Sequence, residues 1–425
     1  MIRHIFAFAS AGFAAIRSLR LTNHFPFIKF ATPDWPDLLP AVIHPLIVVP
    51  GLLGTWPPAL GPRGRIDPIT GAYYNLMEGL TSLGYVPGVS LFSFAYDWRR
   101  GGAELAPMLA AEVKRIRKLS PKKALGRSPR PVDYSRVDLV CHSMGGVIGR
   151  AYIQSESYNG DVNRLALVAS PQQGAIAAYY AFEGGDSNHI GIPVAEARSM
   201  ALLAQAADTW LPHRRIEYLY RGIRGINLPD LYLYVRDSLK SIRDFLPLKE
   251  TNYLYSADES GQETLYPFGC PENSLLESLN RPENLDRLDR VKEISCYYSS
   301  TVQTLVRLKV ISPSGAPLFE HGQPLNPQPA TSYGPGDSIV TRESGHLALP
   351  DTKTDGSAWQ VRVTHSDLGQ KLNRSLNHVQ IVADPDAVRC LLQDFVRAEL
   401  PPLDATIWDG PPISARKPNY RALVI

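Results

Sequence analysis

Residues Val137–Gly146 read VDLVCHSMGG, and VIGRAYIQ follows them directly. The first six residues form an apolar run typical of a buried strand, and the residues after Ser143 have apolar side chains at helical spacing. A sharp turn from strand to helix needs small residues around a serine and projects its Oγ above the sheet. The stretch therefore predicts a nucleophile elbow at Ser143.

The match to the G-x-S-x-G pattern of such elbows fails at one position, because Cys141 stands where the first glycine is usual. A small side chain still fits there. The alternative is a chance match in which Ser143 only caps a helix. The strand-turn-helix context favours the elbow, in which the backbone N–H of Met144 lies at a helix N-terminus, where unpaired donors attract an anion.

Short apolar runs alternate with amphipathic ones over residues 44–174, which indicates βαβ units and a mostly parallel sheet. The predicted strands include LIVVPG (Leu46–Gly51) and RLALVAS (Arg164–Ser170), and GAELAPMLAAEVKRIRKL (Gly102–Leu119) is a predicted helix. The pattern predicts an α/β fold.

The pattern changes over residues 175–300, where Tyr-rich and Leu-rich helical stretches such as 196–210 and 228–246 follow one another. This change predicts a helical cap inserted into a core that resumes at residues 301–400. An N-terminal extension (1–43) and a Pro-rich tail (401–425) complete the predicted organisation.

Composition excludes several classes of protein. The chain has 425 residues, 44% hydrophobic, enough for a large core, and a net charge of +3 gives no global basic field for nucleic acid. No run of about 18 apolar residues is present to span a bilayer. The four cysteines have neither the spacing of a zinc site nor the density of a disulfide scaffold. We therefore expect a soluble or peripheral globular protein in a reducing compartment.

The first 20 residues, MIRHIFAFASAGFAAIRSLR, fit two descriptions. They resemble a weak export signal, and they equally fit an amphipathic helix lying on a membrane. Because Arg17 and Arg20 follow the apolar run at once, a cytoplasmic or peripheral membrane location is favoured over secretion.

Two further segments offer partners for the serine. In GPGDSIV, a Gly-rich turn presents Asp337, and in LNHVQIVADPDAV a loop presents His378. A loop aspartate more often bonds its own backbone, and His142, His346 and His365 are competing bases. Chain order favours His378, because Ser, Asp, His is the α/β-hydrolase order, and His142 should point to the opposite side of its strand.

The loop VVPGLLGT offers a second anion donor. Gly51 permits close backbone approach, and the N–H of Leu52 would point at a developing oxyanion. A Pro-Gly turn after a strand is common. The segment therefore supports an oxyanion hole only because it follows an earlier strand and precedes the predicted elbow in the chain.

VVPGLLGT, the stretch ending in YDWR at Arg99, CHSMGG, GPGDSIVTRES and NHVQIVADP together resemble the lecithin:cholesterol acyltransferase family, which includes lysosomal phospholipase A. YDWR is the most specific element. The resemblance implies an α/β-hydrolase with a cap and an acyl-serine intermediate. It also implies the site residues, namely Ser143, Asp337 and His378 as the catalytic triad and the Leu52 and Met144 amides as the oxyanion hole.

The chain departs from that family in one segment. Secreted members carry a disulfide-closed lid, whereas residues 52–80 here contain no cysteine. In the matching place, Trp56 either touches lipid or is structural, and the latter is favoured. Asp97 and Arg99 of YDWR are interpreted as a framework ion pair.

A basic run lies between the predicted helix and the elbow strand, with only Asp133 opposing it. It either holds anionic lipid head groups or is a solvated helix end, and the second interpretation is slightly favoured. Its members are Lys114, Arg115, Arg117, Lys118, Lys122, Lys123, Arg127, Arg130 and Arg136.

The sequence thus predicts serine-dependent acyl transfer from a lipid ester to water or an alcohol, with peripheral membrane contact as an open question. The alternatives are a thioesterase or peptidase on the same fold, and a non-enzymatic lipid-binding protein. No metal or dinucleotide cofactor is implied, because no ligand cluster or G-x-G-x-x-G after a strand is present.

Overall fold

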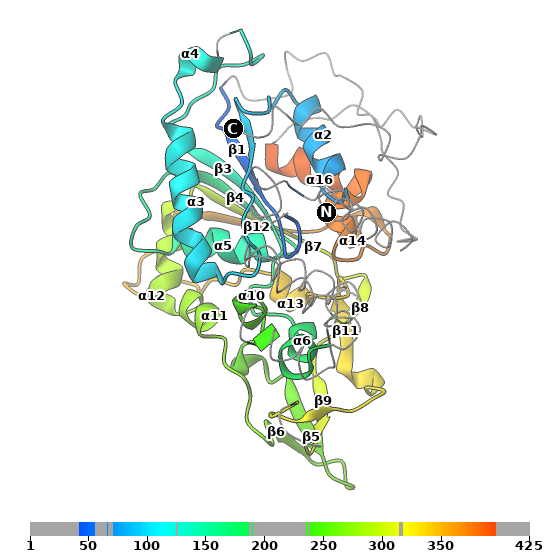
Figure 1. The fold of residues 1–425 in the computed structure, drawn as a ribbon. Coiled ribbons are helices and arrows are strands. Elements are labelled where there is room, and N and C mark those ends of the chain that lie inside the picture. The colour runs from blue at the N-terminus through cyan, green and yellow to red at the C-terminus, as the bar shows by residue number, and fades with distance from the viewer. Residues whose placement is uncertain are drawn as a thin grey trace, which may run out of the picture.

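The computed structural model describes residues 42–55, 66, 71–124, 126–186, 189, 235–236, 239–313 and 318–396 (Figure 1). The predictions for the first 20 residues, Trp56 and the Pro-rich tail lie outside these ranges, as do the first predicted cap helix and about half of the second. Within the described ranges, no helix combines the length and the apolar character that a membrane crossing requires.

A six-stranded sheet forms the centre of the molecule, in the order β12-β7-β4-β3-β1-β2. Every neighbouring pair in it is parallel, so the expected α/β class is confirmed. All six residues of β3 are buried, as in a strand covered on both faces. The strands are β1 (Leu46–Val49), β2 (Leu91–Ser93), β3 (Val137–His142), β4 (Val162–Val168), β7 (Glu293–Tyr298) and β12 (Arg362–Asp367).

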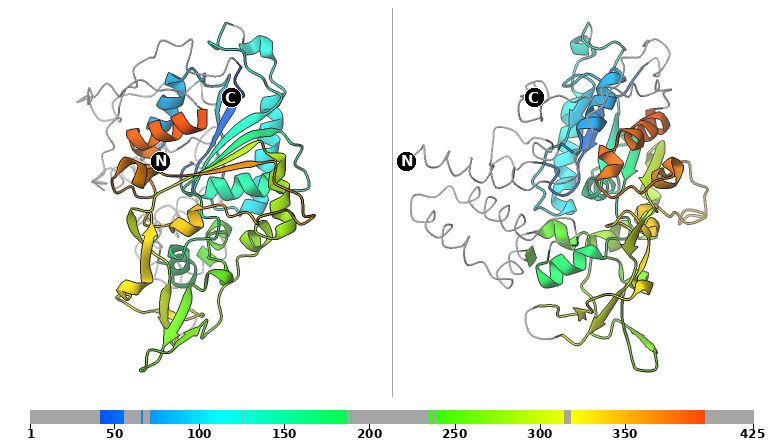
Figure 2. Two further views of the ribbon diagram at one scale, coloured as in Figure 1. Left: turned by 180° about the vertical axis from the view of Figure 1, so that it is seen from behind. Right: turned by 90° about the vertical axis from the view of Figure 1, so that its right-hand side faces the viewer.

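Helices cover both faces of this sheet (Figures 1 and 2). One face carries α3 (Gly102–Arg117) and α5 (Met144–Ile153), which pack against each other. The other carries α2 (Tyr74–Ser82), α15 (Gln380–Ala383) and α16 (Pro385–Val396). In α16 the apolar side chains lie on one buried stripe, which is why this final helix docks on the sheet.

A second, smaller region extends from the sheet and is drawn in green and yellow in Figure 1. It contains a four-stranded sheet in the order β10-β9-β5-β6 and a pair, β11-β8, with its own apolar cluster around Tyr179 and Leu254. Its strands are β5 (Leu254–Ala257), β6 (Glu263–Leu265), β8 (Val302–Leu305), β9 (Leu308–Ile311), β10 (Gln323–Pro324) and β11 (Tyr333–Gly336).

Short helical elements connect these parts. They are α4 (Pro121–Ala124), α6 (Ala177–Gly184), α10 (Lys240–Arg243), η4 (Lys249–Thr251), α11 (Ser274–Leu279), α12 (Pro282–Leu285), η5 (Asp286–Arg290), η6 (Ala330–Ser332), α13 (Arg342–Gly345) and α14 (Leu368–Leu372).

The described part of residues 175–300 differs from the helical cap that the sequence predicts. It includes strands β5 and β6, and its last strand, β7, belongs to the central sheet. Conversely, β8 to β11 follow β7 in the chain but lie outside the central sheet. A short apolar run has the same pattern in either sheet, so periodicity alone does not show which sheet a strand joins.

Candidate active site

Ser143 lies at the turn between β3 and α5 and has φ 52° and ψ −120°. A positive φ is uncommon for a residue with a Cβ and stores strain. The turn is held because Ser143 N–H donates to the Val168 carbonyl at 2.8 Å and Gly146 N–H donates to the Ser143 carbonyl at 3.0 Å. The predicted elbow geometry is therefore present, with Ser143 93% buried.

The two glycines after Met144 are explained by close packing. A Cβ on Gly145 would lie 2.1 Å from the Val49 carbonyl oxygen, and one on Gly146 would lie 2.0 Å from Ser170 Oγ. Helix α5 thus begins directly against the ends of β1 and β4. A larger residue at either position would displace the turn that presents Ser143.

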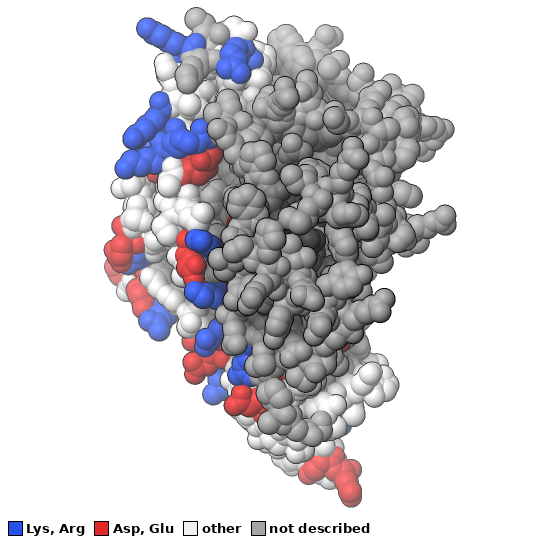
Figure 3. All heavy atoms as spheres, viewed as in Figure 1, with Lys and Arg blue, Asp and Glu red and all other residues white. Residues whose placement is uncertain are grey.

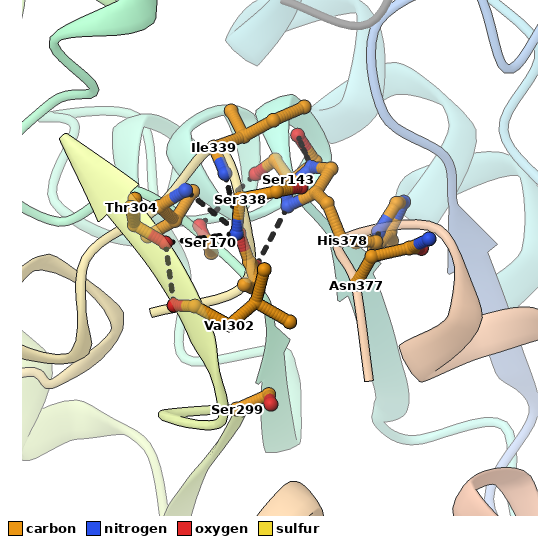
Figure 4. Close-up of polar contacts among 12 residues, drawn as sticks. Ser143, Ser170, Ser299, Val302, Thr304, Ser338, Ile339, Asn377 and His378 are labelled. Atoms are coloured by element: carbon orange, nitrogen blue, oxygen red, sulfur yellow. Dashed lines mark hydrogen bonds and ion pairs between the residues drawn. The ribbon is translucent and has the colours of Figure 1, made fainter. Parts of the chain in front are cut away.

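The structure brings Ser143, His378 and Asp337 into one hydrogen-bonded line. His378 Nε2 lies 2.9 Å from Ser143 Oγ, and His378 Nδ1 lies 2.8 Å from Asp337 Oδ2. Figure 4 shows His378 and Ser143 facing each other. Because a carboxylate only accepts, Nδ1 carries the hydrogen and Nε2 is free to accept from the serine hydroxyl.

The Asp337 carboxylate is oriented by its own turn. Oδ1 accepts hydrogen bonds from the N–H groups of Ile339 (3.0 Å) and Val340 (2.7 Å), which leaves Oδ2 for the imidazole. Thr304 Oγ1 accepts from Ser338 N–H at 2.8 Å, as Figure 4 shows, and His378 N–H donates to the Asp337 carbonyl at 2.7 Å. The carboxylate therefore bonds its own backbone, as a loop aspartate usually does, and also reaches the histidine.

The competing histidines are placed differently. The rings of His346 and His365 pack against each other, with centroids 4.7 Å apart, and His346 also contacts Tyr298. His142 is close to the serine, but its ring faces Tyr73 and the backbone of His378. Neither arrangement gives Ser143 a second base.

The two candidate anion donors flank the serine. A Cβ on Gly51 would lie 2.8 Å from Ser143 Cβ, so the backbone that leads to Leu52 runs against the elbow, and Met144 opens α5. Within the described part of the chain, neither the Leu52 nor the Met144 N–H donates a hydrogen bond. Both groups are therefore available to an oxyanion at this position.

Tyr96 is a residue at this site that sequence reasoning missed. Its hydroxyl donates to the carbonyls of Pro50 at 2.5 Å and Gly51 at 3.3 Å. The Gly51 carbonyl and the Leu52 N–H belong to one trans peptide and point in opposite directions, so Tyr96 helps to set the direction of that N–H. Its place in the YDWR motif could have drawn attention to Tyr96, but the motif alone did not show which groups the tyrosine contacts.

The other members of YDWR form the predicted framework pair. Arg99 Nη2 lies 2.5 Å from Asp97 Oδ2, so the expected ion pair is confirmed. Partial burial acts to raise the pKa of Asp97, but the hydrogen bonds from Arg99 outweigh it and hold that pKa below its usual value. This pair fixes the chain after β2 and does not touch Ser143.

Comparison with known proteins agrees with the sequence motifs. The family model described as lecithin:cholesterol acyltransferase matches residues 64–220. Phospholipase A(1) LCAT3 from Arabidopsis thaliana is 29% identical over 105 residues, which are 24% of this chain and 21% of that protein. The match therefore spans about a fifth of that relative's length.

Solved structures also align over most of the chain. Mature lipase BlEst2 from Bacillus licheniformis is 12% identical and has a TM-score of 0.37, with 87% of this chain and 97% of that chain covered. The Tle4–Tli4 complex gives 13% identity and a TM-score of 0.46, with 84% and 98% covered. With its parallel sheet, its serine elbow and these sequence matches, the chain is an α/β-hydrolase similar to the lecithin:cholesterol acyltransferase family.

Proposed function

We propose that this protein transfers the acyl group of a lipid ester to water or an alcohol through an acyl-Ser143 intermediate. The observation that supports the proposal is the hydrogen-bonded line of Ser143, His378 and Asp337. It lies next to the N–H groups of Leu52 and Met144, neither of which donates a hydrogen bond within the described part of the chain. The similarity to lecithin:cholesterol acyltransferases and to a phospholipase A(1) supports a lipid ester as the acyl donor.

The first half-reaction forms the acyl-enzyme. His378 Nε2 takes the hydroxyl proton as Ser143 Oγ attacks the ester carbonyl carbon, and Asp337 holds the imidazole in the tautomer that can accept this proton. The Leu52 and Met144 N–H groups stabilise the negative charge on the carbonyl oxygen. The alcohol leaves with the proton from His378.

The second half-reaction releases the acyl group. Water or a second alcohol loses a proton to His378 Nε2 as its oxygen attacks the acyl carbon, and the proton then returns to Ser143 Oγ. Whether water or alcohol takes the acyl group depends on how well the cap excludes water.

The proposal is tested first by covalent labelling. We expect a fluorophosphonate probe to label the wild-type protein on Ser143 and to leave Ser143→Ala unlabelled. The same variant should lose hydrolysis of 4-nitrophenyl butyrate down to the residual level of the binding site, roughly 10⁶-fold in kcat. Turnover by Ser143→Ala equal to that of the wild type would reject the assignment.

The substrate is tested by product analysis. Phosphatidylcholine vesicles, triacylglycerol, acyl-CoA and a peptide ester are supplied separately, each with and without a long-chain alcohol. Preference for the vesicles supports the proposal, and formation of an alcohol ester identifies transfer. Turnover confined to acyl-CoA or the peptide ester would instead identify a thioesterase or a peptidase. A labelled protein that releases no product from any donor would contradict the proposed turnover.

A further inference from the structure

A buried hydrogen-bond path runs beneath Ser143 and joins the loop after β1 to the loop that carries His378. Gly51 N–H donates to Tyr73 Oη at 2.8 Å. Tyr73 Oη lies 2.7 Å from His142 Nδ1, and His142 Nε2 lies 3.2 Å from the carbonyl oxygen of His378. The two side chains along the path, Tyr73 and His142, are at least 95% buried. Four segments that are separate in sequence therefore meet in one polar path.

The direction of the hydrogen bonds follows from the two ends. The His378 carbonyl only accepts, so His142 Nε2 carries the hydrogen. Burial, and the nearby His378, lower the pKa of His142 to about 3, so its ring is neutral and Nδ1 has a free lone pair. The Tyr73 hydroxyl, which already accepts from Gly51, then donates to Nδ1. Each polar group on the path is satisfied in one consistent arrangement.

Both ends of the path adjoin groups that the proposed mechanism uses. Gly51 immediately precedes Leu52, whose N–H is a proposed oxyanion donor, and the other end is the backbone of the proposed base. The His142 ring also packs on the His378 ring, with centroids 5.0 Å apart, and on the Tyr73 ring at 5.6 Å. A Cβ on Gly51 would lie 3.1 Å from His142 Nδ1, so the loop has little room to shift.

We propose that Tyr73 and His142 are positioning residues, which hold the loop of the oxyanion donor and the loop of the base at the distance that the reaction requires. This inference rests on the proposed function. The two side chains act through the backbone N–H of Gly51 and the backbone carbonyl of His378. Asp337 orients the His378 ring and Tyr96 orients the Gly51 peptide, whereas the Tyr73–His142 path joins the two loops.

Tyr73→Phe removes the centre of the path, and Tyr134→Phe is its matched control. Tyr134 is equally buried, and its hydroxyl donates to the Val89 carbonyl at 2.8 Å. It precedes the amino end of β3, whereas Ser143 follows the carboxyl end of that strand. With 4-nitrophenyl butyrate, we expect Tyr73→Phe to lower kcat by ~10- to 100-fold with KM within about twofold, because small displacements of reacting groups cost rate rather than binding. Tyr134→Phe should keep kcat within about twofold, even if it lowers the midpoint of thermal unfolding as much as Tyr73→Phe does.

A second pair of variants tests the His142 end. His142→Gln keeps an amide donor that can reach the His378 carbonyl, whereas His142→Leu removes it. We expect a loss in kcat of ~100-fold for His142→Leu and of less than ~10-fold for His142→Gln. Because the path acts as a unit, Tyr73→Phe combined with His142→Leu should lose about as much as His142→Leu alone.

The outcomes separate this inference from the function on which it rests. The wild-type protein being neither labelled by fluorophosphonate nor active on 4-nitrophenyl butyrate would reject both. A wild type labelled on Ser143, together with Tyr73→Phe that behaves like Tyr134→Phe, would reject the positioning role alone. The positioning role would also be rejected if His142→Gln lost as much kcat as His142→Leu, or if the losses in kcat of the two single variants were additive in the double variant. Where Tyr73→Phe does not fold, the His142 pair decides.

Discussion

The residues at the candidate site have two different roles: some exchange a proton, and others orient the residues that do. Ser143 and His378 exchange a proton in the proposed mechanism, whereas one oxygen of Asp337 is committed to the backbone of its own turn. That commitment leaves the carboxylate little freedom to rotate away from His378. The orientation of the base is therefore decided by the turn after β11, residues 337–340, whose conformation the carboxylate itself stabilises.

Asp337→Asn tests this orientation at the residue scale. The amide can still accept from the backbone, but it no longer selects the tautomer with the hydrogen on Nδ1, so we expect kcat to fall about 10⁴-fold with little loss of folding stability. Steady-state hydrolysis of 4-nitrophenyl butyrate measures the effect. Asp258→Asn is the matched control, since that carboxylate also accepts from two N–H groups of its own loop, and it should retain full activity. Equal activity of the two variants would contradict the role of Asp337.

At the scale of elements, helix α5 connects the candidate site to the segment formed by α11 and α12. Its fully buried Arg150 donates to Gln154 Oε1 (3.0 Å), Gln172 Oε1 (2.8 Å) and the Leu279 carbonyl (2.7 Å). Burial lowers the pKa of this guanidinium to about 10, which still leaves it charged at neutral pH. The charge is kept inside because several acceptors replace water.

Arg150→Met should therefore destabilise the protein by roughly 2–6 kcal/mol, because it leaves the buried side-chain oxygens of Gln154 and Gln172 without this donor and each such loss costs about 1–3 kcal/mol. Urea denaturation measures the free energy of unfolding. Arg115→Met is the comparison, since Arg115 pairs with Glu112 on the partly exposed surface of α3, and its loss should cost less than about 1 kcal/mol. A similar cost for both variants would show that Arg150 is not the anchor described.

At the scale of the whole molecule, the parallel sheet has two unlike ends. Ser143 follows the carboxyl end of β3, whereas Arg136 precedes the amino end of the same strand and Arg117 ends α3. Figure 3 shows Lys and Arg side chains gathered near α4. Arg115 and Arg117 pair with Glu112 and Asp161. Lipid held by this basic run would lie at the end of the sheet away from Ser143, which favours the interpretation as a solvated helix end.

The smaller region meets the core through a carboxyl group with an unusual environment. Asp244, just after α10, accepts from Gly102 N–H at the start of α3 at 2.6 Å. Burial raises its pKa to about 6, against the opposing effect of that hydrogen bond. Because the pKa of Asp244 is raised in the folded state, its favourable contribution to the free energy of unfolding is fully present below about pH 4. That contribution is lost as the pH rises through 6.

Asp244→Asn should remove this pH dependence. The variant keeps an acceptor for Gly102 without a buried charge, so at pH 8 we expect it to be more stable than the wild type by up to about 3 kcal/mol. At pH 4 the two proteins should differ little. Urea denaturation at both pH values provides the measurement, and an identical difference at pH 4 and pH 8 would contradict the raised pKa.

The sequence by itself determined the parallel core, the turn at Ser143 and the identities of its partners Asp337 and His378. Strand and helix periods are local, and a strained turn with glycines behind a serine has a local pattern. The chain order of Ser143, Asp337 and His378 then selected the partners of the serine, because Ser, Asp, His is the order of the catalytic residues in this fold. The ion pair of Asp97 and Arg99 was likewise readable from two neighbouring residues.

Only the tertiary structure decided which strands join the central sheet and what lies beneath the serine. Strands β7 and β8 are close in sequence and similar in pattern, yet they belong to different sheets. Tyr73, Tyr96 and His142 reach the site because folding brings distant backbone groups within hydrogen-bond distance of them. Such contacts depend on the packing of several segments at once, and no spacing within one segment records them.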